Sequence, residues 1–215
     1  MPVTVKICGL NTTDSLHAAI DAGAEMVGFV FFEKSPRHLT LDQARILGAE
    51  VGGRAQKVAL SVDAGDDALQ AVIEALSPDL LQLHGHETPE RVRAVKNRFG
   101  LKVMKVLSVG QAEDLESVPL YETVADLLLF DTKPPKEAQL PGGNGISFDW
   151  SLLAGLSQRL PYMLSGGLNP DNVAKALAMT GAWGLDVSSG VETAPGRKDP
   201  ALIRRFMAAV RAAAG

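Results

Sequence analysis

The chain has 215 residues, and 46% of them are hydrophobic. Its net charge is −4, and it has a single cysteine, Cys8. This length and apolar content can supply one sizeable core, while a lone cysteine excludes an intrachain disulfide and favours a reducing cytoplasm. No apolar run approaches the about 20 residues of a membrane span, and no Lys/Arg cluster is interleaved with aromatic residues, so we expect neither a membrane nor a nucleic-acid partner.

Short apolar runs alternate with longer amphipathic segments along the whole chain. The runs predict strands at 3–8, 26–32, 57–62, 79–84, 102–107, 126–131, 162–166 and 183–188. The intervening segments predict helices at 12–23, 40–52, 66–77, 88–98, 111–117, 149–158, 170–179 and 199–213. An eightfold alternation predicts a single-domain α/β fold over residues 1–215, a closed parallel (βα)8 TIM barrel. An open doubly wound sheet usually stops at about five or six strands and needs a switch point.

In such a barrel, chemistry gathers where the strands end and the following loops begin. Cys8, His84, Asp131 and Asp186 all lie at these strand ends. The longest irregular stretch, 132–145, also follows a strand, and a long loop in a compact domain is usually functional. We therefore expect the functional site at this end of the barrel.

Lys6 and Cys8 lie two residues apart on the first predicted strand, so their side chains share a face. If Val3, Val5 and Ile7 face the helices, Lys6 and Cys8 point into the barrel. A lysine there is expected to favour the thiolate and lower the pKa of Cys8. The alternatives are that Lys6 pairs with a barrel carboxylate and that Cys8 packs as a small hydrophobic residue.

Asp131 closes the apolar strand "DLLLFD". A carboxylate at the end of a buried barrel strand favours a catalytic or binding role, although it could instead serve the turn at "DTKPP". The first and sixth strands lie across the barrel mouth from each other. Cys8 and Asp131 could therefore act as base and acid on opposite sides of a substrate.

The "HGH" motif at 84–86 raises the question of a metal site, because two imidazoles can share one ion. The other histidines, His17 and His38, lie on a predicted helix and in a loop, so such a site would need carboxylates or Cys8 to complete it. We therefore predict no metal.

Three glycine-containing segments follow the late strands: "PGGNG" (141–145), "SGGLNPDN" (165–172) and "DVSSGVE" (186–192). Backbone N–H groups in such loops can approach an anion, and phosphate sites of these barrels typically use the loops after strands seven and eight. The glycines could instead cap helices and form turns. No G-x-G-x-x-G motif follows the first strand, which disfavours a dinucleotide.

An ordered set of motifs resembles the phosphoribosylanthranilate isomerase family of tryptophan biosynthesis over essentially the whole chain. The motifs are "VKICGL", "GFVFFEKSPRHL", "LQLHG", "LLFDT", "GGNGISFDW", "LSGGLNPDNV" and "GLDVSSGVETAPGRKD". The resemblance implies an Amadori rearrangement of a small phosphorylated substrate, N-(5-phosphoribosyl)anthranilate, without a cofactor. Monomer and homodimer both remain open.

Carried over by residue, the resemblance implies that Cys8 is the general base and Asp131 the general acid. It implies that a guanidinium fork of Arg37, in "SPRHL", holds the anthranilate carboxylate, and that the glycine loops grip the phosphate. The expected substrate-binding set is Lys6, Arg37, His84, Gly143, Gly145, Gly166, Gly167, Asp186, Ser188 and Ser189.

Two rivals remain open. The analogous isomerase of histidine biosynthesis typically uses two aspartates and a substrate with two phosphates, so Cys8 and the SPR segment speak against it. A non-catalytic phosphate-binding barrel would bind ligand without turnover, and it leaves Cys8 and Asp131 unexplained.

Overall fold

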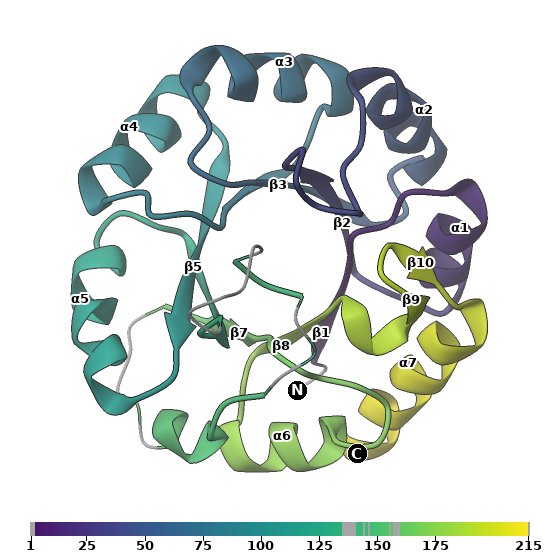
Figure 1. Cartoon of the computed structure of the whole chain (residues 1–215), viewed down its shortest axis with the longest axis vertical. Helices are drawn as coiled ribbons and strands as arrows, with labels where there is room; N and C mark the ends of the chain where they lie inside the picture. Colours follow the sequence, from purple (N-terminus) through teal and green to yellow (C-terminus); the bar gives the residue numbers. More distant parts are fainter. Residues whose placement is uncertain are drawn as a thin grey trace.

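A computed structural model describes residues 3–134, 141–143, 145, 147–154, 156 and 160–214. Eight parallel strands close into a barrel in sequence order, and the last strand pairs with the first (Figure 1). The strands are β1 (Thr4–Cys8), β2 (Met26–Phe31), β3 (Gln56–Ser61), β4 (Leu80–Leu83), β5 (Lys102–Val109), β6 (Leu127–Thr132), β7 (Tyr162–Leu164) and β8 (Gly184–Val187). The predicted (βα)8 barrel is confirmed.

Helices surround the strands as an outer ring (Figure 1). They are α1 (Thr13–Asp21), α2 (Leu41–Val51), α3 (Asp66–Leu76), α4 (Pro89–Phe99), α5 (Val118–Tyr121), α6 (Val173–Thr180) and α7 (Pro200–Ala214). The 3₁₀ helix η1 (Ala112–Ser117) leads directly into α5. Across the described part of the chain, no helix has the length and apolar character needed to cross a membrane.

Three regions differ from the prediction. The expected helix at 111–117 is the 3₁₀ helix η1, and the α-helix α5 begins only after it. The expected helix at 149–158 is only the short 3₁₀ helix η2 (Trp150–Leu153), because the backbone becomes extended at Ala154; residues 155 and 157–159 lie outside the described residues. After β8, the chain forms the 3₁₀ helix η3 (Ser189–Val191) and a small antiparallel hairpin of β9 (Glu192–Ala194) and β10 (Arg197–Lys198) before α7. The expectation of one simple helix after each strand is therefore too regular.

Local capping sets several helix boundaries. The side chain of Thr40 accepts the N–H of Gln43, whose side chain in turn accepts the N–H of Thr40, so a reciprocal capping box starts α2. Thr88 caps α4 ahead of Pro89, and Gly100 ends that helix in the left-handed conformation. These signals fix where the helices begin relative to the strand ends that carry the site.

The alternation of side chains along the strands divides the core into two regions. Outward-facing residues such as Val5 and Ile7 join the large cluster beneath the helices, which confirms the expected orientation of β1. Inside the barrel, an apolar floor is formed by Met26, Val58, Leu80, Met104, Val106, Leu127, Leu129 and Met163. Cys8 lies above this floor with Val30 and Leu60. This floor fills the barrel interior below Cys8, and the pocket lies above it at the C-terminal ends of the strands.

Candidate active site

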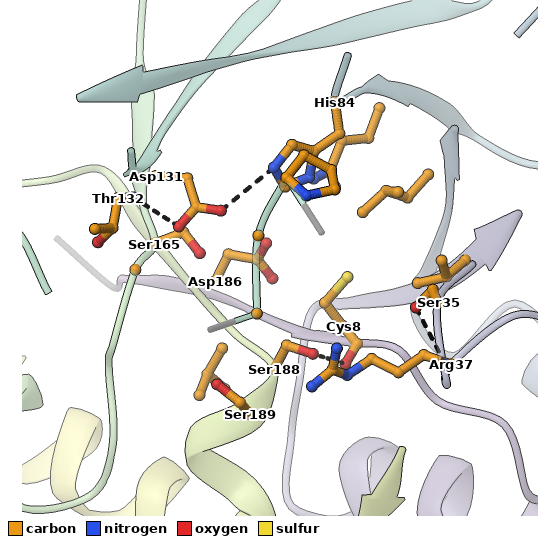
Figure 2. Close-up of a pocket in the computed structure, with 18 of the residues that line it drawn as sticks. Cys8, Ser35, Arg37, His84, Asp131, Thr132, Ser165, Asp186, Ser188 and Ser189 are labelled. Atoms are coloured by element: carbon orange, nitrogen blue, oxygen red, sulfur yellow. Dashed lines mark hydrogen bonds and ion pairs between the residues drawn. The ribbon is translucent and has the colours of Figure 1, made fainter. Parts of the chain in front are cut away.

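A pocket opens at the C-terminal ends of the strands, with about 830 Å³ of space when the open solvent at its mouth is included. One wall is apolar and comes from the ends of β2 and β3, where Val30, Phe32, Leu60 and Val62 lie. The other walls are polar and carry most of the predicted residues, among them Cys8, His84, Asp131, Asp186, Ser188 and Ser189 (Figure 2). The pocket thus offers one apolar side and one side rich in hydrogen-bonding groups.

Cys8 shares the barrel interior with a buried ion pair. Lys6 Nζ lies 3.0 Å from both carboxylate oxygens of Asp186, and the lysine is fully buried. A Cβ atom at Gly28 would lie 2.9 Å from Cys8 Sγ and 3.0 Å from Lys6 Nζ, so both side chains occupy the space that this glycine leaves. Lys6 therefore both pairs with a barrel carboxylate and contacts the thiol.

Burial dominates the ionisation of these three groups. Burial raises the pKa of Cys8; Lys6 opposes this effect, but Asp186 raises the pKa further. Burial also raises the pKa of Asp186 more than Lys6 lowers it. Although burial alone lowers the pKa of Lys6, the neighbouring Asp186 and Cys8 raise it above its ordinary value. The expectation of a lowered thiol pKa is therefore wrong, because Lys6 already has a carboxylate partner and the thiol is almost wholly desolvated.

Asp131 lines the pocket, and one of its two oxygens binds the neighbouring backbone. Its Oδ1 accepts the N–H of Thr132 at 2.8 Å, so the local turn role is partly present. Its Oδ2 lies 3.3 Å from His84 Nε2, without the alignment of a hydrogen bond (Figure 2). A Cβ atom at Gly142 would lie 2.6 Å from Oδ2 and 2.8 Å from His84 Cε1, so this glycine packs directly over the pair.

Arg37 reaches the pocket from the loop after β2, but its fork is already occupied. Nε and Nη2 each donate to a carboxylate oxygen of Glu192 at 2.8 Å, and both side chains are buried. A Cβ atom at Gly143 would lie 2.7 Å from Nη1, which places this remaining nitrogen beside the 141–143 segment. Arg37 can therefore offer a ligand the N–H groups of Nη1, whereas the sequence predicts a two-pronged contact from the guanidinium group.

Glu192 also holds Lys198, which links Arg37 to the first strand. Lys198 Nζ donates to Glu192 Oε1 at 2.6 Å and to Ser188 Oγ at 3.1 Å, and Ser188 Oγ donates to the carbonyl of Cys8 at 3.1 Å. Burial lowers the pKa of Lys198 to about 8. Despite its burial, Glu192 has a lowered pKa, because Arg37 and Lys198 both stabilise the carboxylate.

The three glycine-containing segments that we expect to bind an anion contribute to the pocket only in part. Gly143, Gly166, Gly167, Ser188 and Ser189 line the pocket. Two members of the expected binding set are not among its lining residues. Gly145 lies near Ser189, where a Cβ atom would be 3.9 Å from Ser189 Oγ, and Lys6 is fully buried.

The two histidines of the "HGH" motif point in different directions. His84 faces the pocket, whereas the His86 side chain is 97% exposed and its Nδ1 lies 3.1 Å from Asp63 Oδ2. Among the described residues, no group of three or more His, Cys, Asp or Glu side chains is arranged to hold a metal ion. The motif therefore does not act as a joined pair of ligands.

Sequence reasoning missed four residues that shape the site: Gly28, Gly142, Glu192 and Lys198. The signal for Gly28 was available, because a glycine inside a strand often marks a close approach of other groups. Gly142 stood in a recognised glycine segment beside the glycines that were chosen. No local pattern indicated that Glu192 pairs with Arg37, from which 155 positions separate it.

The fold and the pocket define a (βα)8-barrel protein whose Cys8 and Asp131, from β1 and β6, line one pocket at the C-terminal ends of the strands. The family described as N-(5'-phosphoribosyl)anthranilate (PRA) isomerase matches residues 5–209, and the chain belongs to this family of isomerases. The N-(5'-phosphoribosyl)anthranilate isomerase of Rhodopseudomonas palustris (strain HaA2) is 61% identical over 212 residues, which cover 99% of this chain and 97% of that protein.

Solved structures agree with this assignment. Phosphoribosyl anthranilate isomerase from Thermotoga maritima has a TM-score of 0.88 and 34% identity, covering 98% of this chain and 99% of the other. A phosphoribosyl anthranilate isomerase in complex with reduced 1-(o-carboxyphenylamino)-1-deoxyribulose 5-phosphate has a TM-score of 0.85 and 32% identity over the same shares of the two chains.

Proposed function

We propose that this protein catalyses the Amadori rearrangement of N-(5-phosphoribosyl)anthranilate to 1-(2-carboxyphenylamino)-1-deoxyribulose 5-phosphate, with Asp131 as general acid and Cys8 as general base. The observation that carries the proposal is that both side chains, from β6 and β1, line one pocket. That pocket has an apolar wall and an edge of glycine and serine residues, which suits a substrate with an aryl group at one end and a phosphate at the other.

Asp131 initiates the reaction. Its Oδ2 faces the pocket, where a protonated carboxyl group can donate to the furanose ring oxygen. The C1–O bond then breaks, the oxygen becomes a hydroxyl and the nitrogen lone pair forms the C1–N iminium. The second carboxyl oxygen keeps its bond from the Thr132 N–H, which holds the group in orientation.

Cys8 completes the proton transfers. As a thiolate it removes the proton from C2, and the electron pair of the C–H bond forms an enolamine. The enolamine then gains a proton at C1 and loses its hydroxyl proton at C2 to give the ketone, so the product is an isomer of the substrate. Burial raises the pKa of Cys8 and so disfavours the thiolate. The positive charge of the iminium formed in the first step offsets this effect and favours ionisation of the thiol when the base is needed.

The remaining side chains bind and orient the substrate. Arg37 Nη1 donates to the anthranilate carboxylate, and the aryl ring packs on the apolar wall near Val30 and Phe32. Backbone N–H groups at Gly166 and Gly167, with the hydroxyls of Ser188 and Ser189, bind the phosphate. This arrangement spans the pocket and leaves the ribose carbons between Cys8 and Asp131.

The test is the decay of N-(5-phosphoribosyl)anthranilate fluorescence after addition of the protein, with product identified by mass and chromatographic retention. We expect rapid loss of substrate fluorescence with the wild type and none with a Cys8→Ser/Asp131→Asn control. Binding without turnover would instead indicate a phosphate-binding barrel. Turnover only of the two-phosphate substrate would indicate the isomerase of histidine biosynthesis.

A further inference from the structure

Lys105 and Glu87 form a second buried ion pair that the proposed chemistry does not use. Lys105 lies on β5 between the inward-facing Met104 and Val106, so its side chain lies on the outer side of the barrel wall. Its Nζ lies 2.7 Å from Glu87 Oε2, and the two side chains are 2% and 3% exposed. A fully buried pair of charges is costly unless further hydrogen bonds satisfy both groups.

Those further bonds go to the backbone on either side of His84. Lys105 Nζ donates to the carbonyl of Gly85 at 2.7 Å and to that of Leu83 at 3.3 Å. Glu87 Oε2 accepts the N–H of Gly85 at 2.9 Å. The ion pair therefore grips both neighbours of His84, at the point where β4 ends and its loop begins.

The same pair also joins the neighbouring elements. Glu87 Oε1 accepts the N–H of Asp63 at 3.0 Å, just beyond β3, and the Glu87 carbonyl accepts the hydroxyl of Tyr121 from α5 at 3.0 Å. The Lys105 ammonium lies 5.9 Å from the centre of the Tyr121 ring. The ion pair and its hydrogen bonds thus connect four elements below the rim of the pocket: β3, β4, β5 and α5.

His84 is the side chain that this arrangement presents to the pocket. Its backbone N–H donates to the carbonyl of Ser61 at 2.9 Å, and its Nε2 lies 3.3 Å from Asp131 Oδ2 (Figure 2). Within the described residues, Nε2 makes no aligned hydrogen bond of its own. The place of the ring is therefore set by the backbone on both sides, which Lys105 and Glu87 hold.

We propose that Lys105 and Glu87 are positioning residues that hold the His84 ring against the carboxyl group of Asp131 from outside the barrel. The catalytic consequence rests on the proposed role of Asp131 as general acid. An apolar pair could fill the same volume, but it could neither donate to the two carbonyls nor accept the N–H groups of Gly85 and Asp63. A displacement of His84 by a fraction of an ångström changes the electrostatic surroundings of the Asp131 carboxyl group, so we expect kcat to fall more than the affinity for substrate.

A double-mutant cycle with N-(5-phosphoribosyl)anthranilate as substrate tests the catalytic consequence. Lys105→Met is expected to lower kcat by about 10-fold and to change KM by less than about twofold. In a His84→Ala background the same substitution should lower kcat by less than about twofold, because the residue through which it acts is gone. Equal losses in both backgrounds, or an unchanged kcat in His84→Ala alone, would overturn the proposal.

A readout that needs no turnover separates this proposal from the proposed function. The ring resonances of His84, assigned by comparison with His84→Ala, should shift in Lys105→Met and stay in place in Lys96→Met. Lys96 pairs with Asp126 at the opposite rim of the barrel and serves as the matched lysine control. If the wild type fails to isomerise the substrate, the proposed function is wrong, whereas an unmoved His84 resonance overturns the positioning role.

A second substitution keeps the proposal testable if the Lys105→Met protein does not fold. Glu87→Gln keeps the volume and one acceptor oxygen but removes the charge that pairs with Lys105. It should shift the same His84 resonances and show the same non-additivity with His84→Ala. Normal resonances and additive kcat losses in a folded Glu87→Gln protein would also overturn the proposal.

Discussion

The two ends of β6 carry the same type of side chain in different roles. Asp126, just before the strand, uses both oxygens for structure: Oδ2 accepts the N–H of Val103 at 2.9 Å and Oδ1 pairs with Lys96 at 2.7 Å. Asp131, near the other end, uses Oδ1 for the Thr132 N–H and turns Oδ2 to the pocket. Five positions in the sequence therefore separate a carboxylate that joins elements from one that lines the pocket.

The difference extends around the barrel. At the N-terminal rim, Glu25, Asp79 and Asp126 directly precede β2, β4 and β6, and each accepts a backbone N–H from the preceding strand. The donors are Val5 at 2.8 Å, Lys57 at 2.7 Å and Val103 at 2.9 Å. At the C-terminal rim, Asp131 and Asp186 line the pocket. Among these five carboxylates, the three at the N-terminal rim bind the backbone of a neighbouring strand, and the two at the C-terminal rim line the pocket.

The strongest test of this contrast is Asp131→Asn. An amide keeps the shape of the carboxyl group but cannot donate its proton to the ring oxygen, so kcat should fall by about 10²- to 10⁴-fold. Affinity for a product analogue, measured by calorimetry, should stay within a few fold. Turnover like that of the wild type would falsify the assignment of Asp131 as the acid.

Cys8→Ser should be nearly as damaging, because a serine hydroxyl is a much weaker proton acceptor at neutral pH than a thiol. We expect kcat to fall by about 10²-fold or more, and iodoacetamide to inactivate the wild type unless product occupies the pocket. Steady-state kinetics and mass spectrometry of the alkylated protein measure both effects. Full activity after complete alkylation of Cys8 would mean that the thiol only packs the core.

The ion pair of Lys6 and Asp186 beside the thiol predicts the direction in which the pKa of Cys8 shifts when either residue is changed. Only the thiolate is a base, and the pKa of Cys8 is raised. We therefore expect kcat/KM to increase with pH, with the midpoint of the increase above the ordinary thiol pKa of about 8.5. Lys6→Met should move the limb to higher pH, since it removes a cation, whereas Asp186→Asn should move it lower. Thiolate absorbance reports the same titration without turnover, because the chain has one cysteine. Shifts in the same direction for both variants would indicate a purely structural effect.

Arg37→Ala should have a more selective effect. Loss of the Nη1 donor should raise KM for the substrate by about 10-fold, and the penalty should shrink for an aniline analogue that lacks the carboxylate. Kinetics with both substrates measure the difference. An equal penalty for the two would mean that Arg37 supports the loop through Glu192 without binding the carboxylate.

The smallest effect is expected at the other end of β6. Asp126→Asn weakens the pair with Lys96 and the bond from Val103, both partly exposed, so the free energy of unfolding should fall by about 1 kcal/mol. Its kcat at moderate temperature should match that of the wild type. Urea unfolding combined with kinetics checks both values, and a large loss of kcat in Asp126→Asn would remove the contrast between the two rims.

Local pattern was sufficient for the eight strands and for the inward direction of Lys6 and Cys8, because strand periodicity records which face is buried. It could not give contacts between distant segments, so it missed the Glu192 carboxylate that occupies the Arg37 fork and the β9–β10 hairpin that carries Lys198. It also gave the wrong sign for the pKa of Cys8. A neighbouring lysine is visible in the sequence, whereas the degree of desolvation emerges only when the barrel is closed.

Closure of the barrel also has a consequence for how the protein is made. Lys6 lies on the first strand, whereas its carboxylate partner Asp186 and the hydroxyl that binds the Cys8 carbonyl, that of Ser188, come 180 positions later. Cys8 is therefore synthesised well before Ser188, the residue whose hydroxyl binds its carbonyl in the folded barrel. Before β8 is synthesised, Lys6 lacks its partner Asp186, and β1 lacks one of its two neighbouring strands. The surroundings of Lys6 and Cys8 are therefore complete only once β8 has paired with β1.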